Sequence, residues 1–263
     1  MIPNPIIKVL STLSCHGVRH LLMGGQACVF YGAAEFSRDC DIVIVADDEN
    51  LLRLNAALLE LQAECIAVPP YEKHYLDRGH AVHFRCRNSE AAGIRLDVMT
   101  KMRGCDEFTV LWERRMTLQD TDGVCYELLG IEDLVRAKKT QRDKDWPMIR
   151  RLVDAHHEEF RDDPSEEQVL FWLRESRNPE VLIFLGSEYP DIFRKAIKNR
   201  ACLGEALSGS RSAIQQGLNA EELAERKADE AYWRPLKREL EKLRFSRRNA
   251  DNGKTLSDDR SKD

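Results

Sequence analysis

The chain has 263 residues, of which 43% are apolar and 32% charged, with a net charge of −5. This balance argues against a globally basic nucleic-acid coat, and no apolar run approaches the roughly 20 residues that a membrane helix needs. The N-terminus lacks the pattern of a signal peptide, and eight cysteines without a Cys-x-x-Cys pair indicate reduced thiols. We therefore expect a cytoplasmic protein without a membrane segment.

The first sixty residues alternate between helical and strand patterns. Asn4-Pro5 is a typical helix start, and Gly17 ends the apolar stripe that follows it. Beyond Gly17 we expect a buried strand over 19–23, a short helix over 25–32, a second strand over 39–45, and a helix that Asp47 caps and that runs to about 62.

The middle of the chain predicts further strands. Residues 80–86 alternate in polarity, and in 93–99 the side chains of Arg95, Asp97 and Met99 share one face. Residues 115–119 and 124–128 flank the turn residues 120–123 and predict a hairpin. Helical patterns begin at Ile131 and dominate the rest of the chain.

A change in composition near Pro164 divides the chain. We expect a first domain over 1–158, a helical C-terminal region over 159–245 and a disordered tail over 246–263, which has almost no apolar side chains. In the helical region Asn219 predicts the start of a long charged helix to about Arg244, which Pro235 would kink or break. Four basic side chains of the helical region, ahead of this helix, are candidates for contacts with acceptor phosphates: Arg194, Lys195, Lys198 and Arg200.

Two acidic residues, Asp39 and Asp41, follow the Gly24-Gly25 pair. A strand that ends in Gly-Gly before a helix presents open backbone N–H groups, which favour a bound phosphate. Residues i and i+2 of a strand project from the same face, so the two carboxylates can share two divalent cations. Asp97 is the natural third acid, because its strand is predicted to lie beside theirs.

Other readings of the same residues remain open. Gly-Gly followed by Asp-x-Asp also occurs as a tight turn and a solvated strand start. Arg95 lies on the same strand face as Asp97, so an ordinary Asp97–Arg95 ion pair is an alternative to a metal ligand. His80, His83 and Cys86 are ligand-type residues, but their spacing puts neighbours on opposite strand faces and disfavours zinc.

Gly24-Gly25, a spacer of thirteen residues, Asp39-x-Asp41 and the later Asp97 together resemble the DNA polymerase β-like nucleotidyltransferase superfamily. Within it, the chain is most similar to bacterial AbiEii/AbiGii-type toxin nucleotidyltransferases, over roughly residues 5–155. The segment 131–145 also resembles the Lys-containing helix and Arg-x-Lys-Asp segment of that group.

The resemblance implies an α+β fold, with a nucleotidyltransferase-type mixed sheet flanked by helices and a helical C-terminal region after it. It implies that Asp39 and Asp41 hold two Mg²⁺ ions, with Mn²⁺ as an alternative, and that Asp97 binds the acceptor-side metal and helps deprotonate the attacking hydroxyl. The residues it implies for the nucleotide phosphates are Gly24, Gly25, Ser37, Arg38, Lys138 or Lys139, and Arg142.

The leading functional hypothesis is transfer of a nucleoside monophosphate from an NTP to a hydroxyl of an RNA, tRNA included, or of a protein. In this hypothesis the chain is the toxin of a toxin–antitoxin or phage-defence pair, with an antitoxin protein as its partner. The alternatives are an aminoglycoside-type enzyme that modifies a small molecule, and an inactive protein of the same fold that binds or regulates. A P-loop and a Rossmann dinucleotide motif are both absent from the sequence.

Overall fold

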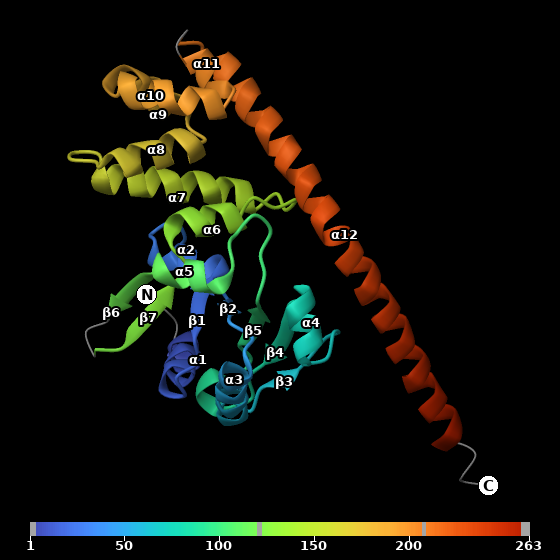
Figure 1. The fold of residues 1–263 in the computed structure, drawn as a ribbon. Coiled ribbons are helices and arrows are strands. Elements are labelled where there is room, and N and C mark those ends of the chain that lie inside the picture. Colours follow the sequence, from blue (N-terminus) through green and yellow to red (C-terminus); the bar gives the residue numbers. More distant parts are fainter. Residues whose placement is uncertain (1–3, 120–122, 207–208, 259–263) are drawn as a thin grey trace.

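A computed structural model describes residues 4–119, 123–206 and 209–258. In these residues a seven-stranded sheet runs in the order β3-β4-β5-β2-β1-β7-β6. Its pairings are both parallel and antiparallel, and helices flank it (Figure 1). The predicted α+β class, a mixed sheet flanked by helices and followed by a helical C-terminal region, is confirmed.

The N-terminal elements form because apolar residues recur at helical or strand spacing. Ile6, Val9, Leu10 and Leu13 of the first helix are fully buried or nearly so. The side chain of Asp47 accepts a hydrogen bond from the backbone N–H of Asn50 and caps the third helix, as predicted. The elements are α1 (Asn4–Cys15), β1 (His20–Met23), α2 (Gly24–Phe30), β2 (Asp39–Ile44) and α3 (Asp48–Glu60).

The central strands confirm the prediction that matters most for the site. Strand β5 (Arg95–Met99) lies directly beside β2 and runs parallel to it. On its other side β5 pairs with β4 (Val82–Arg85), which in turn pairs with the short β3 (Glu64–Cys65). Three short helical elements of this region were not predicted: α4 (Lys73–Arg78), η1 (Ser89–Ala91) and α5 (Phe108–Glu113).

The predicted hairpin closes the other end of the sheet. Strands β6 (Met116–Gln119) and β7 (Cys125–Leu128) pair antiparallel, and β7 adds to β1 in parallel. Residues 120–122 of its turn lie outside the described residues. The hairpin therefore extends the sheet on the side away from β5.

A stack of helices follows the sheet (Figure 1). Trp172, Phe171 and Phe193 are among the largest fully buried side chains of the chain, so this stack has its own apolar packing. Its elements are α6 (Ile131–Ala137), α7 (Asp145–Phe160), α8 (Glu166–Glu175), α9 (Pro179–Glu188), α10 (Pro190–Ala196), η2 (Ile197–Asn199) and α11 (Cys202–Ala206).

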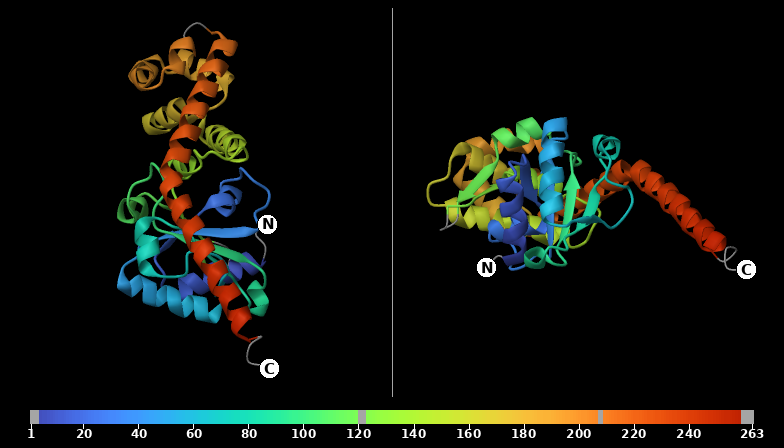
Figure 2. Two further views of the ribbon diagram at one scale, coloured as in Figure 1. Left: turned by 90° about the vertical axis from the view of Figure 1, so that its right-hand side faces the viewer. Right: turned by 90° about the horizontal axis from the view of Figure 1, so that it is seen from below.

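The last helix, α12 (Arg211–Asp258), spans both the helical stack and the sheet (Figure 2). It begins before Asn219 and continues through Pro235, so the predicted start is wrong, and of the two predicted effects of Pro235 a break is excluded. An internal proline costs a helix about 3 kcal/mol, which contacts elsewhere along a long helix can offset. The helix also covers residues 246–258 of the expected disordered tail, and residues 259–263 lie outside the described part.

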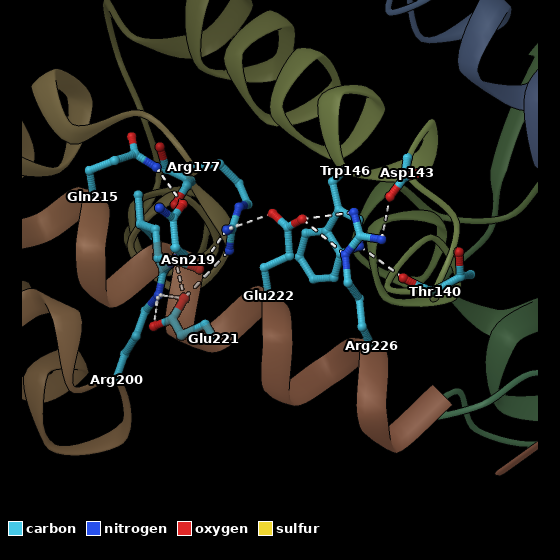
Figure 3. A network of polar contacts seen from close by, with 12 residues as sticks. Thr140, Asp143, Trp146, Arg177, Arg200, Gln215, Asn219, Glu221, Glu222 and Arg226 are labelled. Carbon is cyan, nitrogen blue, oxygen red and sulfur yellow. Dashed lines mark hydrogen bonds and ion pairs between the residues drawn. The ribbon is translucent and has the colours of Figure 1, made fainter. Parts of the chain in front are cut away.

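Paired charges fix α12 to the helical stack (Figure 3). Arg200 Nη2 lies 2.9 Å from Glu221 Oε2, and the same arginine donates to two backbone carbonyls of the stack. Further along α12, Arg226 Nη1 lies 2.7 Å from Asp143 Oδ1, and its guanidinium lies 5.9 Å from the centre of a Trp146 ring. Moving α12 would separate these pairs and leave partly buried charges without partners, which is costly. The network therefore holds α12 in one position.

Among the helices of the described residues, none combines the length and the apolar character that crossing a bilayer requires.

Candidate functional site

Two of the predicted acids meet across the centre of the sheet. In the register of β2 and β5, Asp41 is directly opposite Asp97 and Asp39 is opposite Arg95. On the other side of β2, Asp41 pairs with Met23, the last residue of β1. Residues opposite each other on paired strands project from the same face of the sheet, so Asp41 and Asp97 lie close together although they are far apart in sequence.

The glycine pair closes the same site. Gly24 has a φ of +69°, and a Cβ atom there would lie 1.9 Å from Asp41 Oδ2. A Cβ atom at Gly25 would lie 2.7 Å from Ser37 Oγ. Only glycine lets the chain turn from β1 into α2 this close to a carboxylate, so Gly24 and Asp41 form one structural unit.

The carboxylates of β2 have no ordinary partners. In the described part of the chain no hydrogen bond or ion pair reaches the side chain of Asp41 or of Asp39. Burial, with a further contribution from nearby Asp97, raises the pKa of Asp41 from 3.8 to about 6. Asp39 is exposed at the end of the strand. Anionic groups placed together without counter-charges are costly unless a cation joins them.

Asp97 differs, because it is paired. Arg95 holds both of its oxygens, with Nε at 2.7 Å from Oδ1 and Nη2 at 2.8 Å from Oδ2, and His83 Nδ1 lies 2.9 Å from Oδ1. Burial would raise the pKa of Asp97, but the hydrogen bonds from His83 and Arg95 outweigh it and lower the pKa. The ion pair weighed against a metal role for Asp97 is therefore present. Within the residues described, no three His, Cys, Asp or Glu side chains are arranged to hold a metal ion.

The acids line a cavity of about 680 Å³ together with basic side chains, among them Lys138 and Arg142. Lys138 follows α6 and Asp145 begins α7; Lys138 Nζ lies 3.2 Å from Asp145 Oδ1. The second oxygen of Asp145 accepts hydrogen bonds from Thr140 Oγ1 at 2.6 Å and Arg142 Nε at 2.7 Å. Burial opposes ionisation of Asp145, but Lys138 and these donors keep its pKa below the usual value. Asp145 thus positions two cations that face the acids.

The remaining predicted residues divide between two places. Gly24, Gly25, Ser37, Arg38 and Arg142 all line the acid cavity, together with Lys138. Lys139 points elsewhere: its Nζ lies 2.7 Å from Glu175 Oε2, and it lines two other cavities. The structure therefore separates the two lysines between which the sequence could not choose.

Two residues at the site were not predicted to belong to it, although His83 was considered as a zinc ligand. His83 lies opposite Asp97 in the register of β4 and β5, which is how it reaches the carboxylate. The alternating pattern of residues 80–86 contained that information, but the partner strand was unknown. His80 contacts a different acid, with Nε2 at 2.7 Å from Glu239 Oε2, so His80 and His83 do not share a site. Asp145 ends the Arg-x-Lys-Asp segment and had been treated only as part of that motif.

The basic candidates of the helical stack are largely used internally. Arg194 pairs with Asp191, and Lys195 pairs with Glu166. Arg200 is buried in the network that fixes α12. These three side chains have structural partners in place of a free phosphate-binding face.

No known family model and no curated protein matches the chain in sequence. Two solved structures from Helicobacter pylori are similar in their backbone. A candidate nucleotidyltransferase is 15% identical, with 87% of this chain and 94% of that chain covered and a TM-score of 0.40. The protein JHP933 is also 15% identical, with 89% and 94% covered and a TM-score of 0.38. At such low TM-scores the two matches carry no argument about the fold or activity of this chain.

Proposed function

We propose that the chain is a divalent-cation-dependent nucleotidyltransferase that moves a nucleoside monophosphate from an NTP to a hydroxyl group. The observation that carries this proposal is the register of β2 and β5, which places Asp41 opposite Asp97 beside a glycine turn. Lys138 and Arg142 line the same cavity as these acids. A cavity that contains both acids and bases suits a ligand that combines phosphate with a cation.

The residues divide the work between donor and acceptor. Gly24 and Gly25 leave room for the phosphates beside the backbone, and Lys138 and Arg142 offset their negative charge. The oxygen of the acceptor hydroxyl attacks the α-phosphorus and its proton is released to water, the bond from the α-phosphorus to the oxygen of the β-phosphate breaks, and pyrophosphate leaves. Asp97 stays ionised because its pKa is low, so it can accept the hydrogen bond of the attacking hydroxyl and orient it.

The cation part of the proposal rests on Asp39 and Asp41. Their carboxylates form no hydrogen bond or ion pair in the described residues, and burial beside Asp97 raises the pKa of Asp41 although Lys138 and Arg142 act in the opposite direction. Mg²⁺ or Mn²⁺ bound there would neutralise phosphate oxygens during the displacement. Asp97 is held by Arg95, so its use as a third ligand requires Arg95 Nε and Nη2 to release it.

Labelled-nucleotide transfer tests the proposal. Purified protein is incubated with each α-labelled NTP, Mg²⁺ or Mn²⁺, and cell extract fractionated into RNA, protein and small molecules. We expect label in one fraction, and a loss of about 10³-fold or more in the variant Asp39→Asn plus Asp41→Asn. The matched control is Asp162→Asn plus Asp163→Asn, at two exposed acids far along the chain. Equal labelling by both double variants would refute the assignment.

A polyanionic acceptor, RNA, is supported by the end of α12. Residues 234–248 contain seven basic and two acidic side chains in a chain whose net charge is −5. In the described part of the helix Arg244, Arg247 and Arg248 are exposed and form no ion pair. Such a surface attracts phosphates and repels cationic small molecules such as aminoglycosides.

Charge reversal tests the acceptor. With Arg244, Arg247 and Arg248 all changed to Glu, labelling of RNA should fall below that of the unaltered protein. The difference between the two proteins should shrink as the salt concentration is raised. Labelled protein or labelled small molecules, with unlabelled RNA, would instead assign the acceptor to one of those classes.

A second candidate is a protein of this fold that binds a nucleotide without turnover. The bidentate Arg95–Asp97 pair favours it, because a neutralised Asp97 is a poor ligand and a poor acceptor of protons. Equilibrium binding of NTP without transfer to any fraction would support this candidate.

The proposed biological role is a toxin, with an antitoxin protein as its partner, and it rests on the sequence resemblance. Expression of the chain should arrest growth, and Asp39→Ala plus Asp41→Ala should abolish the arrest. Normal growth during expression of active enzyme would exclude this role while leaving the transferase proposal in place.

A further inference from the structure

A second cavity, of about 270 Å³, adjoins the acid cavity. Met23, Met99 and Arg142 line both, so the two cavities are neighbours. We call the second cavity the Trp233 pocket. Its other lining residues include Met102, Ala137, Gln141, Asp229, Trp233 and Lys237.

The α12 side of the Trp233 pocket is held by a buried acid. Asp229 is 2% exposed, and its Oδ1 accepts a hydrogen bond from Trp233 Nε1 at 3.0 Å. Its Oδ2 accepts one from the backbone N–H of Gln141 at 3.0 Å, and Arg103 Nε lies 3.3 Å from Oδ1. The indole is therefore fixed in orientation, with its only polar atom used, and offers an aromatic surface at the pocket.

One polar group of the pocket has a defined direction. Lys237 Nζ donates to Gln141 Oε1 at 3.2 Å. This bond assigns the oxygen of the Gln141 amide to the lysine and leaves its Nε2 group as a donor, with no partner among the described residues. The pocket combines apolar side chains and the indole of Trp233 with charged groups at Arg103, Lys139 and Lys237. An aromatic surface beside an oriented amide is the type of site that accepts a heteroaromatic ring.

We propose that the Trp233 pocket binds the nucleobase of the donor NTP, stacked against Trp233 and selected by Gln141. This inference rests on the proposed function, because it assigns the base of the same nucleotide whose phosphates lie at Gly24 and Arg142. Arg142 lines both cavities, so a ligand whose phosphates lie at Arg142 can place its aromatic ring in the Trp233 pocket. The C-terminal helix is then part of the nucleotide site, although its sequence carries no nucleotide motif.

The pocket fits the donor base better than a base of the acceptor. Gln141, Arg142 and Lys138 belong to one connected segment that Asp145 and Asp229 hold in place. A base at Gln141 is therefore tied in position to phosphates at Arg142 and Lys138. The exposed basic end of α12, by contrast, begins beyond Lys237 and leads away from the body of the protein (Figure 2).

Equilibrium binding separates the base from the phosphates. Calorimetry with Mg²⁺ compares the four α,β-methylene NTPs with inorganic triphosphate, for the unaltered protein and for Trp233→Ala, Trp233→Phe and Gln141→Ala. Leu223→Ala, at a 55% exposed side chain of the same helix and outside both cavities, is the matched control. Thermal unfolding of each variant shows whether α12 remains docked.

We expect Trp233→Ala to weaken the preferred NTP about tenfold or more, as loss of base stacking does, and to leave inorganic triphosphate within about twofold. Trp233→Phe should retain most of the affinity, and Gln141→Ala should change the ranking of the four NTPs. Equal NTP affinity in Trp233→Ala and Leu223→Ala would overturn the inference, and so would a parallel loss of NTP and triphosphate.

The same titrations distinguish the two proposals. NTP bound more tightly than triphosphate, but unaffected by any Trp233 variant, would reject the Trp233 pocket and retain the nucleotidyltransferase. No NTP binding by the unaltered protein would reject both.

Discussion

The acid cavity and the contact between α12 and the helical stack are both rich in partly buried charge, but they treat it differently. At α12 the charges form pairs, as in Arg200 with Glu221 and Arg177 with Glu222. At the start of β2, Asp39 and Asp41 form no ion pair or hydrogen bond through their side chains in the described residues, and the pKa of Asp41 rises to about 6. Charge that is paired within the chain stabilises the fold, whereas charge left unpaired beside a cavity is available to a ligand.

Removing one member of a buried pair tests the structural half of this comparison and should have the largest effect on stability. Arg200→Ala removes the nearer of the two arginines paired with Glu221, leaving Arg177 at 3.7 Å, and removes hydrogen bonds to the carbonyls of Leu173 and Ser176. We expect the free energy of unfolding in urea to fall by about 3 kcal/mol. Lys198→Ala, at an exposed neighbouring position, should change it little. A loss of under about 1 kcal/mol at Arg200 would show that the network contributes no stability.

The glycine turn should respond next in size. Gly24→Ala adds backbone strain at φ +69° and pushes a methyl group into Asp41 Oδ2, so we expect a loss of about 2 kcal/mol and reduced nucleotidyl transfer. Gly32→Ala is a matched control, because its φ is +70° but its Cβ would meet nothing within 4 Å. It should lose only the strain energy and retain transfer. Similar losses of transfer in both variants would mean that contact with Asp41 is unimportant.

The unpaired carboxylate should destabilise the protein in a pH-dependent way. The folded protein keeps the proton of Asp41 up to about pH 6, whereas the unfolded chain releases it near 3.8. Folding therefore takes up a proton in this interval, and stability is lost as pH rises through 6. We expect Asp41→Asn to be more stable than the unaltered protein by about 1–2 kcal/mol at pH 8, with the gain disappearing at pH 4.

Thermal unfolding with and without Mg²⁺ measures this prediction. Added Mg²⁺ should raise the Tm of the unaltered protein at pH 8 and narrow its gap to Asp41→Asn, because a bound cation supplies the missing counter-charge. Asp39→Asn, at the exposed carboxylate, is the control for the pH effect. A Tm gain for Asp41→Asn that is the same at pH 4 and pH 8 would contradict the raised pKa.

The smallest effect is expected at the surface pairs of the helical stack. Arg194 and Asp191 are 75% and 83% exposed, so water screens their attraction. Arg194→Ala should change the unfolding free energy by no more than about 0.5 kcal/mol, and RNA labelling should be unchanged. A large loss of RNA labelling in Arg194→Ala would instead support the prediction that Arg194 contacts the acceptor.

Much of the sheet could be predicted because its strands have strong local signals. The Gly-Gly turn, the alternation of residues 93–99 and the Asp47 cap each depend on neighbours within a few positions, and each prediction is confirmed. The length of α12 could not be predicted in this way. Pro235 is a local signal for a break, but contacts such as Arg226 with Asp143 fix the helix to parts of the chain far away in sequence.

By itself, the sequence singled out the residues that we propose for the chemistry: the glycine pair, Asp39, Asp41 and Asp97, and a basic segment that includes Lys138 and Arg142. Only the tertiary structure decided how they combine. It placed Asp41 opposite Asp97, gave Asp97 to Arg95 and His83, sent Lys139 to Glu175, and set Trp233 beside the acid cavity. The reason is physical: residue type and spacing determine local conformation, whereas strand register and helix docking determine which distant charges share one space.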